Sequence, residues 1–245
     1  MANKDIFSKS TERQNIKVTA IIPAYNEEKT ITDVLKIITG SPLIDETIVV
    51  NDGSTDKTVQ VIKGLGFNIR LLNNKENMGK GFALYKGARA AKNSLLLFCD
   101  ADLTGLKQEH LKQLIEPVKE GRVDMVVGVQ EKLSFLQGYS WGQKILPSGK
   151  KKSSFISALG GEKVLWKKDF LEINRIGNSG YGVEQIIVNF FLKNKKNYKN
   201  LELADVGHVW KVKKWGLEGV LKEIVALAVF AKQYIQFEIL KSIKK

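Results

Sequence analysis

Short apolar runs alternate with stretches of helical spacing along the first half of the chain. In the segment 26–40, for example, Ile31, Val34, Leu35 and Ile38 recur every three or four positions, which is typical of an amphipathic helix. Five apolar runs predict strands, at 17–24, 46–52, 68–74, 95–100 and 124–130, and the segments between them predict helices at 26–40, 54–63, 82–92 and 107–119. This alternation indicates a mostly parallel sheet with right-handed crossovers and helices on its faces.

The pattern changes after residue 130. Residues 131–161 carry five glycines, one proline and three consecutive lysines, and we expect a long, mobile loop there. Beyond the loop, the spacing predicts a helix around 183–194, a strand over 199–209 and a closing helix from about Leu217.

Composition places the chain among globular proteins. Of its 245 residues, 43% are hydrophobic, which excludes global disorder. The single cysteine, Cys99, lies inside an apolar run, so we expect a buried thiol, no disulfide and a reducing compartment, hence a cytoplasmic protein. The first residues are polar and show no secretory leader, and the longest apolar run, 224–231, is shorter than the roughly 18 residues of a membrane span.

The chain is basic, with a formal net charge of +13. Residues 185–245 hold 12 lysines, no arginine and five acidic residues. Nucleic acid, an anionic membrane face and phosphorylated substrates are the partners that such a charge favours, and a lysine-rich solvated surface explains it equally well. No zinc-finger, helix-turn-helix or aromatic RNA-reading motif accompanies the lysines, so we expect no nucleic-acid partner.

Two aspartates separated by one residue follow the apolar run at 95–99. Asp100 and Asp102 would project from the carboxyl end of a buried strand, where open α/β sheets bind ligands. Carboxylate oxygens are what Mg²⁺ or Mn²⁺ prefers, and such an ion bridges the phosphates of a nucleotide. An aspartate-rich turn, formed for local hydrogen bonding, is the alternative for the motif taken alone.

Three other strand ends carry polar motifs. PAYNEE at 23–28 joins a strand to a helix N-terminus, which would offer its backbone N–H groups, its dipole and Glu27 to a ligand. NDGSTD at 51–56 places Asp52 in reach of a base or ribose, and in NMGKG at 77–81 two glycines allow close approach while Lys80 pairs with a phosphate. Taken singly, the three motifs are explained by a helix cap, an Asx turn and an ordinary glycine loop. Together with the two aspartates, however, all four motifs fall at the carboxyl ends of consecutive predicted strands. The glycine-rich fingerprint of dinucleotide folds is missing, which argues against an NAD enzyme.

These four motifs, in this order and spacing, resemble the nucleotide-sugar-binding half of family 2 glycosyltransferases with the GT-A fold. The resemblance covers roughly residues 17–130. It implies metal-assisted transfer from a UDP- or GDP-sugar, with Asp102 as a metal ligand and Lys80 close to the base or diphosphate. The remaining nucleotide-sugar contacts that it implies are Pro23, Ala24, Tyr25, Glu27, Asp52, Gly79, Asp100 and Ala101.

Two further residues stand out in the second half. Glu184 follows the glycine-rich turn SGYGV and enters a predicted helix, where it suits either an acceptor-positioning or general-base role or simply a helix first turn. His208, in DVGHVWK, is either a metal ligand or a structural hydrogen-bonder. Both segments resemble those of glucosyl-3-phosphoglycerate synthases, which implies that Glu184 places the acceptor and His208 binds the metal.

The chain also resembles polyprenyl-phosphate sugar transferases of the dolichyl-phosphate mannose synthase type, whose acceptor sits in a membrane. The apolar stripe of the helix predicted at 217–245 fits the inner membrane surface, a dimer contact or the protein core. The acceptor is therefore either a phosphorylated small molecule such as 3-phosphoglycerate or a lipid phosphate. A non-catalytic nucleotide-sugar-binding protein and a nucleotidyltransferase are the alternatives from other classes.

The sequence thus predicts one α/β domain of GT-A type. We expect a flexible lead at 1–16, a nucleotide-sugar-binding subdomain at 17–130, an acceptor-binding subdomain at 131–216 and a terminal amphipathic helix at 217–245. Asp102, Lys80 and Glu184 are the expected catalytic residues, with Lys211 assisting and the loop 131–161 closing over the site.

Overall fold

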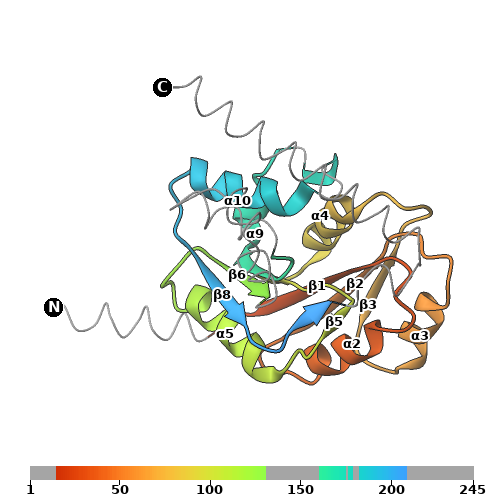
Figure 1. Cartoon of the computed structure of the whole chain (residues 1–245). Helices are drawn as coiled ribbons and strands as arrows, with labels where there is room; N and C mark the ends of the chain where they lie inside the picture. The colour runs from red at the N-terminus through yellow and green to blue at the C-terminus, as the bar shows by residue number, and fades with distance from the viewer. Residues whose placement is uncertain (1–14, 131–159, 175, 179–181, 209–245) are drawn as a thin grey trace, which may run out of the picture.

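A seven-stranded sheet organises the molecule in the computed structural model, which describes residues 15–130, 160–174, 176–178 and 182–208 (Figure 1). The strand order is β3-β2-β1-β4-β7-β6-β8. A separate two-stranded ribbon pairs β5 with β9. The strands are β1 (Val18–Ala24), β2 (Glu46–Asn51), β3 (Arg70–Asn73), β4 (Leu95–Phe98), β5 (Leu103–Thr104), β6 (Met125–Gln130), β7 (Lys163–Trp166), β8 (Tyr198–Leu203) and β9 (Gly207–His208).

Within the described sheet, all strands except β7 point the same way. β1 pairs in parallel with β2 and β4, β2 with β3, and β6 with β8, whereas β7 is antiparallel to both β4 and β6. The carboxyl ends of the parallel strands therefore meet at one edge of the sheet, the carboxyl edge. Because β7 runs in the opposite direction, its first residue, Lys163, lies at that same edge, paired with Phe98. The predicted mostly parallel α/β fold is confirmed.

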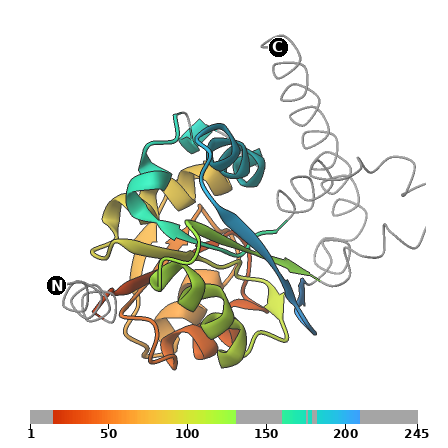
Figure 2. The same ribbon diagram turned by 90° about the vertical axis from the view of Figure 1, so that its left-hand side faces the viewer.

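Helices cover both faces of the sheet, as Figures 1 and 2 show from two sides. Side chains of α2, α3 and α5 join the core cluster on one face, and those of α4, α9 and α10 join the cluster on the other. Their bounds are α2 (Ile31–Thr39), α3 (Thr58–Gly64), α4 (Lys80–Ala90), α5 (Gln108–Lys119), α9 (Lys167–Leu171) and α10 (Val183–Lys193), with a 3₁₀ turn, η2, at Ile176–Asn178.

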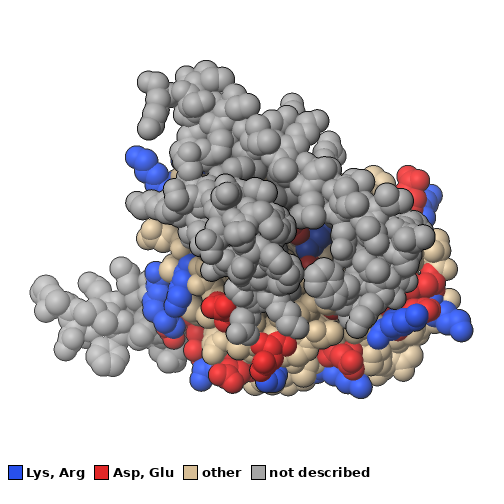
Figure 3. All heavy atoms as spheres, viewed as in Figure 1, with Lys and Arg blue, Asp and Glu red and all other residues tan. Residues whose placement is uncertain are grey.

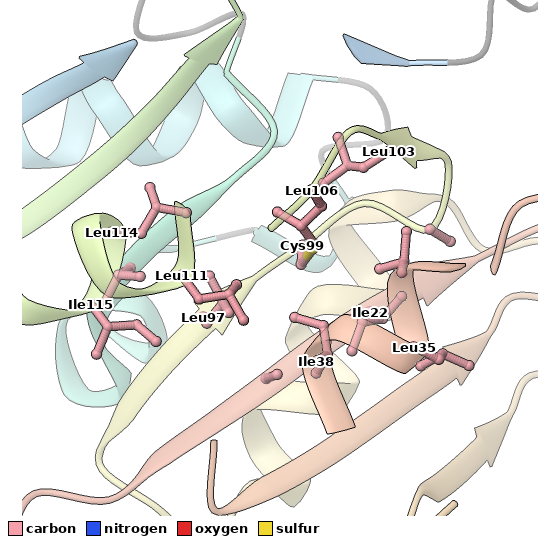
Figure 4. Close-up of a cluster of buried hydrophobic side chains, with 14 of the residues drawn as sticks. Ile22, Leu35, Ile38, Leu97, Cys99, Leu103, Leu106, Leu111, Leu114 and Ile115 are labelled. Carbon is pink, nitrogen blue, oxygen red and sulfur yellow. The ribbon is translucent and has the colours of Figure 1, made fainter. Parts of the chain in front are cut away.

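The central strands are buried on both faces, which explains their nearly continuous apolar sequence. In β4, Leu95 and Leu97 point into the α2/α5 cluster, whereas Leu96 and Phe98 point into the α4/α10 cluster. Figure 4 shows the first cluster, in which Leu97 and Cys99 lie between α2 and α5. Cys99 is free and buried, as expected.

The structure differs from the sequence prediction mainly in the second half. Neither β7 nor α9 was expected, because VLW and the residues after it are too short a segment to show a period. The strand predicted at 199–209 is divided into β8 and β9 by a turn, in which Asp205 adopts a positive φ of 61°. Most of the predicted loop 131–161 and the whole helix predicted at 217–245 lie outside the described residues.

Helix boundaries also shift at two strand ends. α2 begins at Ile31, five residues later than predicted, and α4 begins at Lys80, inside the segment that we expected to be a loop. None of the helices in the described ranges is both long and apolar enough to cross a membrane.

Close packing of α4 on the sheet yields a stability prediction. A Cβ added at Gly87 would lie 2.5 Å from Cγ2 of Ile21 and 3.2 Å from Cγ2 of Val50, both fully buried. We expect Gly87→Ala to lower the free energy of unfolding by about 1–3 kcal/mol, because overpacking outweighs the better helix propensity of alanine. Urea denaturation measures this.

Gly64→Ala on α3 is the matched control, because nothing lies within 4 Å of its added Cβ. It should leave stability unchanged or raise it by up to about 1 kcal/mol. Equal effects of the two substitutions would show that α4 does not pack on β1 as described.

Candidate functional site

The loops after β1 and β2 are joined by hydrogen bonds at the carboxyl edge. The backbone N–H groups of residues 26, 27 and 28 donate to Ser54 Oγ, Thr58 Oγ1 and Asp56 Oδ2, at 3.0, 2.8 and 3.2 Å. These groups are therefore committed within the protein. The expectation that the backbone N–H groups of PAYNEE are offered to a ligand is wrong for these three residues, because the helix begins later and the turn at 54–58 takes the donors.

Asp52 holds the loop that precedes α4. Its carboxylate accepts hydrogen bonds from Asn74 Nδ2 at 2.6 Å, from the Met78 backbone N–H at 3.0 Å and from that of Gly79 at 2.8 Å. The side chain is buried. Asp52 thus fixes the start of α4 by satisfying two N–H groups ahead of the helix.

Gly53 makes this arrangement possible. Its φ is +75°, and a Cβ there would lie 2.5 Å from the carbonyl carbon of Glu76. Only glycine tolerates both the backbone conformation and the close approach of the loop after β3. The end of β2 and the loop at 75–79 therefore form one packed unit.

Lys80 links two carboxylates from distant parts of the chain. Its Nζ lies 2.7 Å from Asp100 Oδ1 and 2.6 Å from Glu184 Oε1. All three side chains are at most one-fifth exposed. Burial disfavours the ammonium, but the charges of Asp100 and Glu184 outweigh this effect and raise the pKa of Lys80 above its usual value. Lys80 is therefore a permanently charged bridge from α4 to the end of β4 and to α10.

Asp100 also belongs to a second group, with Asp102 and His208. One ligand atom from each of these residues lies within 4.8 Å of the others. His208 is brought there by the pairing of β9 with β5, in which it faces Leu103. Two carboxylates and an imidazole are a donor set that fits Mn²⁺ or Mg²⁺.

His208 and Asp102 form an ion pair, with Nδ1 2.9 Å from Oδ1. Burial lowers the pKa of His208, but the hydrogen bond to Asp102 and the charges of Glu162 and the two aspartates outweigh it and raise the pKa to about 9. The surrounding carboxylates thus favour positive charge at His208. A divalent cation bound there would supply that charge in place of the imidazole proton.

The start of β7 forms one wall of this cluster. A Cβ at Gly161 would clash with Asp100 Oδ2, so glycine lets the backbone pass without displacing the carboxylate. Glu162 and Lys163 follow and are both only 1% exposed. Lys163 Nζ donates to the carbonyl of Gly160. Sequence reasoning missed both charged residues, although a Glu-Lys pair between two glycines and an apolar run is an available signal.

Other predicted site residues lie around this centre. Pro23, near the end of β1, and Tyr25 and Glu27, on the loop after it, are partly exposed. Glu27 accepts a hydrogen bond from Thr30 Oγ1 at 2.6 Å. Ala24 and Ala101 are buried in the α2/α5 cluster, and the Ala24 carbonyl accepts a hydrogen bond from the Asp52 N–H at 2.8 Å. Lys211 and residues 131–159 of the predicted closing loop 131–161 lie outside the described residues.

The described surface does not carry one sign of charge. On the face in Figure 3, acidic and basic side chains are interspersed along the side that bears α5, α2 and α3. This mixture suits solvation better than attraction to a polyanion.

Comparisons with known proteins place the chain in a family. A family model described as glycosyl transferase family 2 matches residues 19–162, more than half of the chain. A dolichyl-phosphate beta-glucosyltransferase of Trichomonas vaginalis is 35% identical over 125 residues, which cover 42% of this chain and 34% of that protein. A 4,4'-diaponeurosporenoate glycosyltransferase of Staphylococcus haemolyticus is 34% identical over 114 residues, which cover 44% and 30%. The chain thus spans about a third of the length of these curated relatives.

A solved structure has the same fold. It is glucosyl-3-phosphoglycerate synthase from Mycobacterium tuberculosis, in complex with Mn²⁺, uridine diphosphate and phosphoglyceric acid. The TM-score is 0.67 at 20% sequence identity, over 89% of this chain and 81% of that one. The sheet and its flanking helices are therefore GT-A-like.

The buried Lys163 gives a pH prediction. Burial is the largest influence on this residue and lowers its pKa from 10.5 to about 8. Between about pH 8 and pH 10.5 this lysine is protonated in the unfolded chain but mostly neutral in the folded chain. The free energy of unfolding should therefore rise with pH over this range. From pH 8 to about 9.5, wild type should gain about 1–2 kcal/mol relative to Lys163→Met, measured by urea denaturation. If the free energy of unfolding of the two proteins changed with pH in the same way, the burial of Lys163 would be contradicted.

Proposed function

This chain belongs to glycosyl transferase family 2, and we propose that it moves a sugar from a nucleoside-diphosphate sugar to a phosphate-bearing acceptor. One observation carries the proposal: Lys80, Asp100 and Glu184 form an ion-paired bridge directly beside the group of Asp100, Asp102 and His208. An anionic leaving group and an acceptor hydroxyl or phosphate need these two kinds of side chain close together.

The donor would lie along the carboxyl ends of β1, β2 and β4. Tyr25 and Glu27 on the first loop and the loop held by Asp52 would line the nucleoside part. Asp52 itself has its carboxylate engaged by three donors, so we infer that it serves the donor by fixing the segment 77–79. Lys80, the next residue, would stand beside the diphosphate and stabilise its negative charge.

A divalent cation, Mg²⁺ or Mn²⁺, would be held by Asp102 and His208, with Asp100 next to them. Their hard oxygen atoms and single imidazole fit such an ion, and the solved structure of similar fold is a complex with Mn²⁺ and uridine diphosphate. When bound, the ion neutralises charge that develops on the leaving diphosphate. The protein would hold Asp102 directly before β5 and His208 on β9. The pairing of β5 with β9 keeps these two residues together.

Glu184 would serve the acceptor. It lies in the first turn of α10, its side chain is 15% exposed and its carboxylate is paired with Lys80. This pairing brings the carboxylate to the same ammonium group as Asp100. A charged carboxylate there accepts a hydrogen bond from an acceptor hydroxyl, orients it and can take its proton.

Two acceptor classes follow from the comparisons. The similar solved structure is a complex with phosphoglyceric acid, which favours a phosphorylated small molecule. The relatives of higher sequence identity include a dolichyl-phosphate glucosyltransferase, which favours a lipid phosphate. The two share a phosphate group, and a transfer assay separates them.

That assay uses the full chain with Mn²⁺ and radiolabelled UDP-glucose or GDP-mannose, offered 3-phosphoglycerate or a polyprenyl phosphate in detergent. Label in the acceptor together with a released nucleoside diphosphate supports the proposal and names the acceptor class. Release of pyrophosphate would instead indicate a nucleotidyltransferase. Tight donor binding with no transfer or hydrolysis would indicate a non-catalytic binding protein.

Asp102→Ala should reduce transfer by at least about 100-fold, because it removes a carboxylate that holds the charge-neutralising ion. The melting temperature in the presence of a chelator should change little. Asp33→Ala is the matched control, since Asp33 is 83% exposed on α2 and makes only a loose pair with Lys36 at 3.8 Å. Normal turnover in the Asp102 variant would remove the metal role.

Glu184→Gln should lower kcat by about 100-fold or more if the carboxylate takes a proton from the acceptor. The donor KM should stay close to that of wild type, because Lys80 keeps its partner Asp100. Steady-state kinetics with each substrate varied in turn measure both effects. An unaltered kcat would exclude Glu184 as base and as acceptor anchor.

A further inference from the structure

Glu162 is a buried carboxylate without a hydrogen-bond partner among the described residues. It is 1% exposed, and neither Oε1 nor Oε2 accepts a hydrogen bond. Its backbone is fixed, since its carbonyl accepts from the N–H of Gly128 at 2.8 Å. Leaving such a group unpaired is costly in the interior, and a positive charge close by would offset that cost.

The position of Glu162 shows where that charge belongs. It directly follows Gly161, which packs against the carboxylate of Asp100. Glu162 therefore lies directly beside the group of Asp100, Asp102 and His208, although it is not part of that ligand group.

The neighbouring Lys163 does not meet this need. Val164 packs in the α2/α5 cluster and Leu165 in the α4/α10 cluster, and side chains alternate along a strand. Glu162 accordingly faces the α2/α5 side with Val164, and Lys163 faces the opposite side with Leu165. The hydrogen bond of Lys163 goes to Gly160 rather than to Glu162.

We propose that Glu162 is a positioning residue for the divalent cation, contributing its negative charge from behind Asp100 and His208 without being a direct ligand. The inference rests on the proposed function and goes beyond its two aspartates and histidine. It accounts for a buried carboxylate just before a strand that carries the core residues Val164 and Leu165. In the absence of the cation, Glu162 lowers the stability of the protein, and the cation offsets that loss.

The test measures Mn²⁺ binding to the full chain by isothermal titration calorimetry and melting temperature in excess chelator. The variants are Glu162→Gln, which keeps shape and removes charge, Glu162→Asp, which keeps charge, and Glu172→Gln, an exposed control. We expect Glu162→Gln to raise the Mn²⁺ dissociation constant about tenfold or more, as loss of a residue supporting a metal ligand does. In chelator it should melt at the same temperature as wild type or higher.

Glu162→Asp should bind Mn²⁺ more tightly than Glu162→Gln, and the Glu172 control should match wild type. Wild-type Mn²⁺ affinity in Glu162→Gln, with Asp102→Ala still unable to bind, would overturn this inference and leave the proposed function standing. A marked loss of stability of Glu162→Gln in chelator would assign Glu162 a structural role instead. Absence of Mn²⁺ binding by wild type, with and without UDP-glucose, would overturn the proposed function itself.

Discussion

The ion-paired bridge from Lys80 to Asp100 and Glu184 is the interaction on which the site depends. It joins the first residue of α4, the segment after β4 and the first turn of α10, which are far apart in the sequence. Charges this well enclosed are stable only when paired, so each of the two carboxylates depends on Lys80, and Lys80 depends on the carboxylates. The bridge brings the segments that we propose for donor and acceptor binding to a common point.

The sheet supplies the framework for this bridge. Parallel strands place the ends of β1, β2 and β4 side by side, and the single antiparallel strand of the described sheet brings Glu162 and Lys163 to the same edge. Glycines then allow close approach, of the backbone after β3 at Gly53 and of the Asp100 carboxylate at Gly161. Much of the polar chemistry here, Asp52 included, holds loops in place, so the site is organised before any ligand arrives.

How much the sequence predicts follows from the range of the interactions involved. The first half is predictable because strand and helix periods are local, and four polar motifs at strand ends indicate a common rim. The hydrogen bonds between the segments 26–28 and 54–58 are not predictable in this way. They join two loops, and hydrophobic periodicity describes only strands and helices. The strand β7 is too short to show a pattern, and with it the burial of Glu162 escapes sequence reasoning. His208 was a candidate from its motif alone, but only the pairing of β9 with β5 brings it to Asp102.

The central claim is that this edge of the sheet gathers negative charge in order to hold a cation against a diphosphate. Anomalous diffraction at the manganese edge, from crystals of the full chain grown with Mn²⁺ and UDP, tests it most directly. The account predicts one strong peak in contact with Asp102 and His208, on the side of the UDP phosphates. A peak elsewhere, or UDP bound while Asp102 and His208 remain paired with each other and hold no ion, would contradict it.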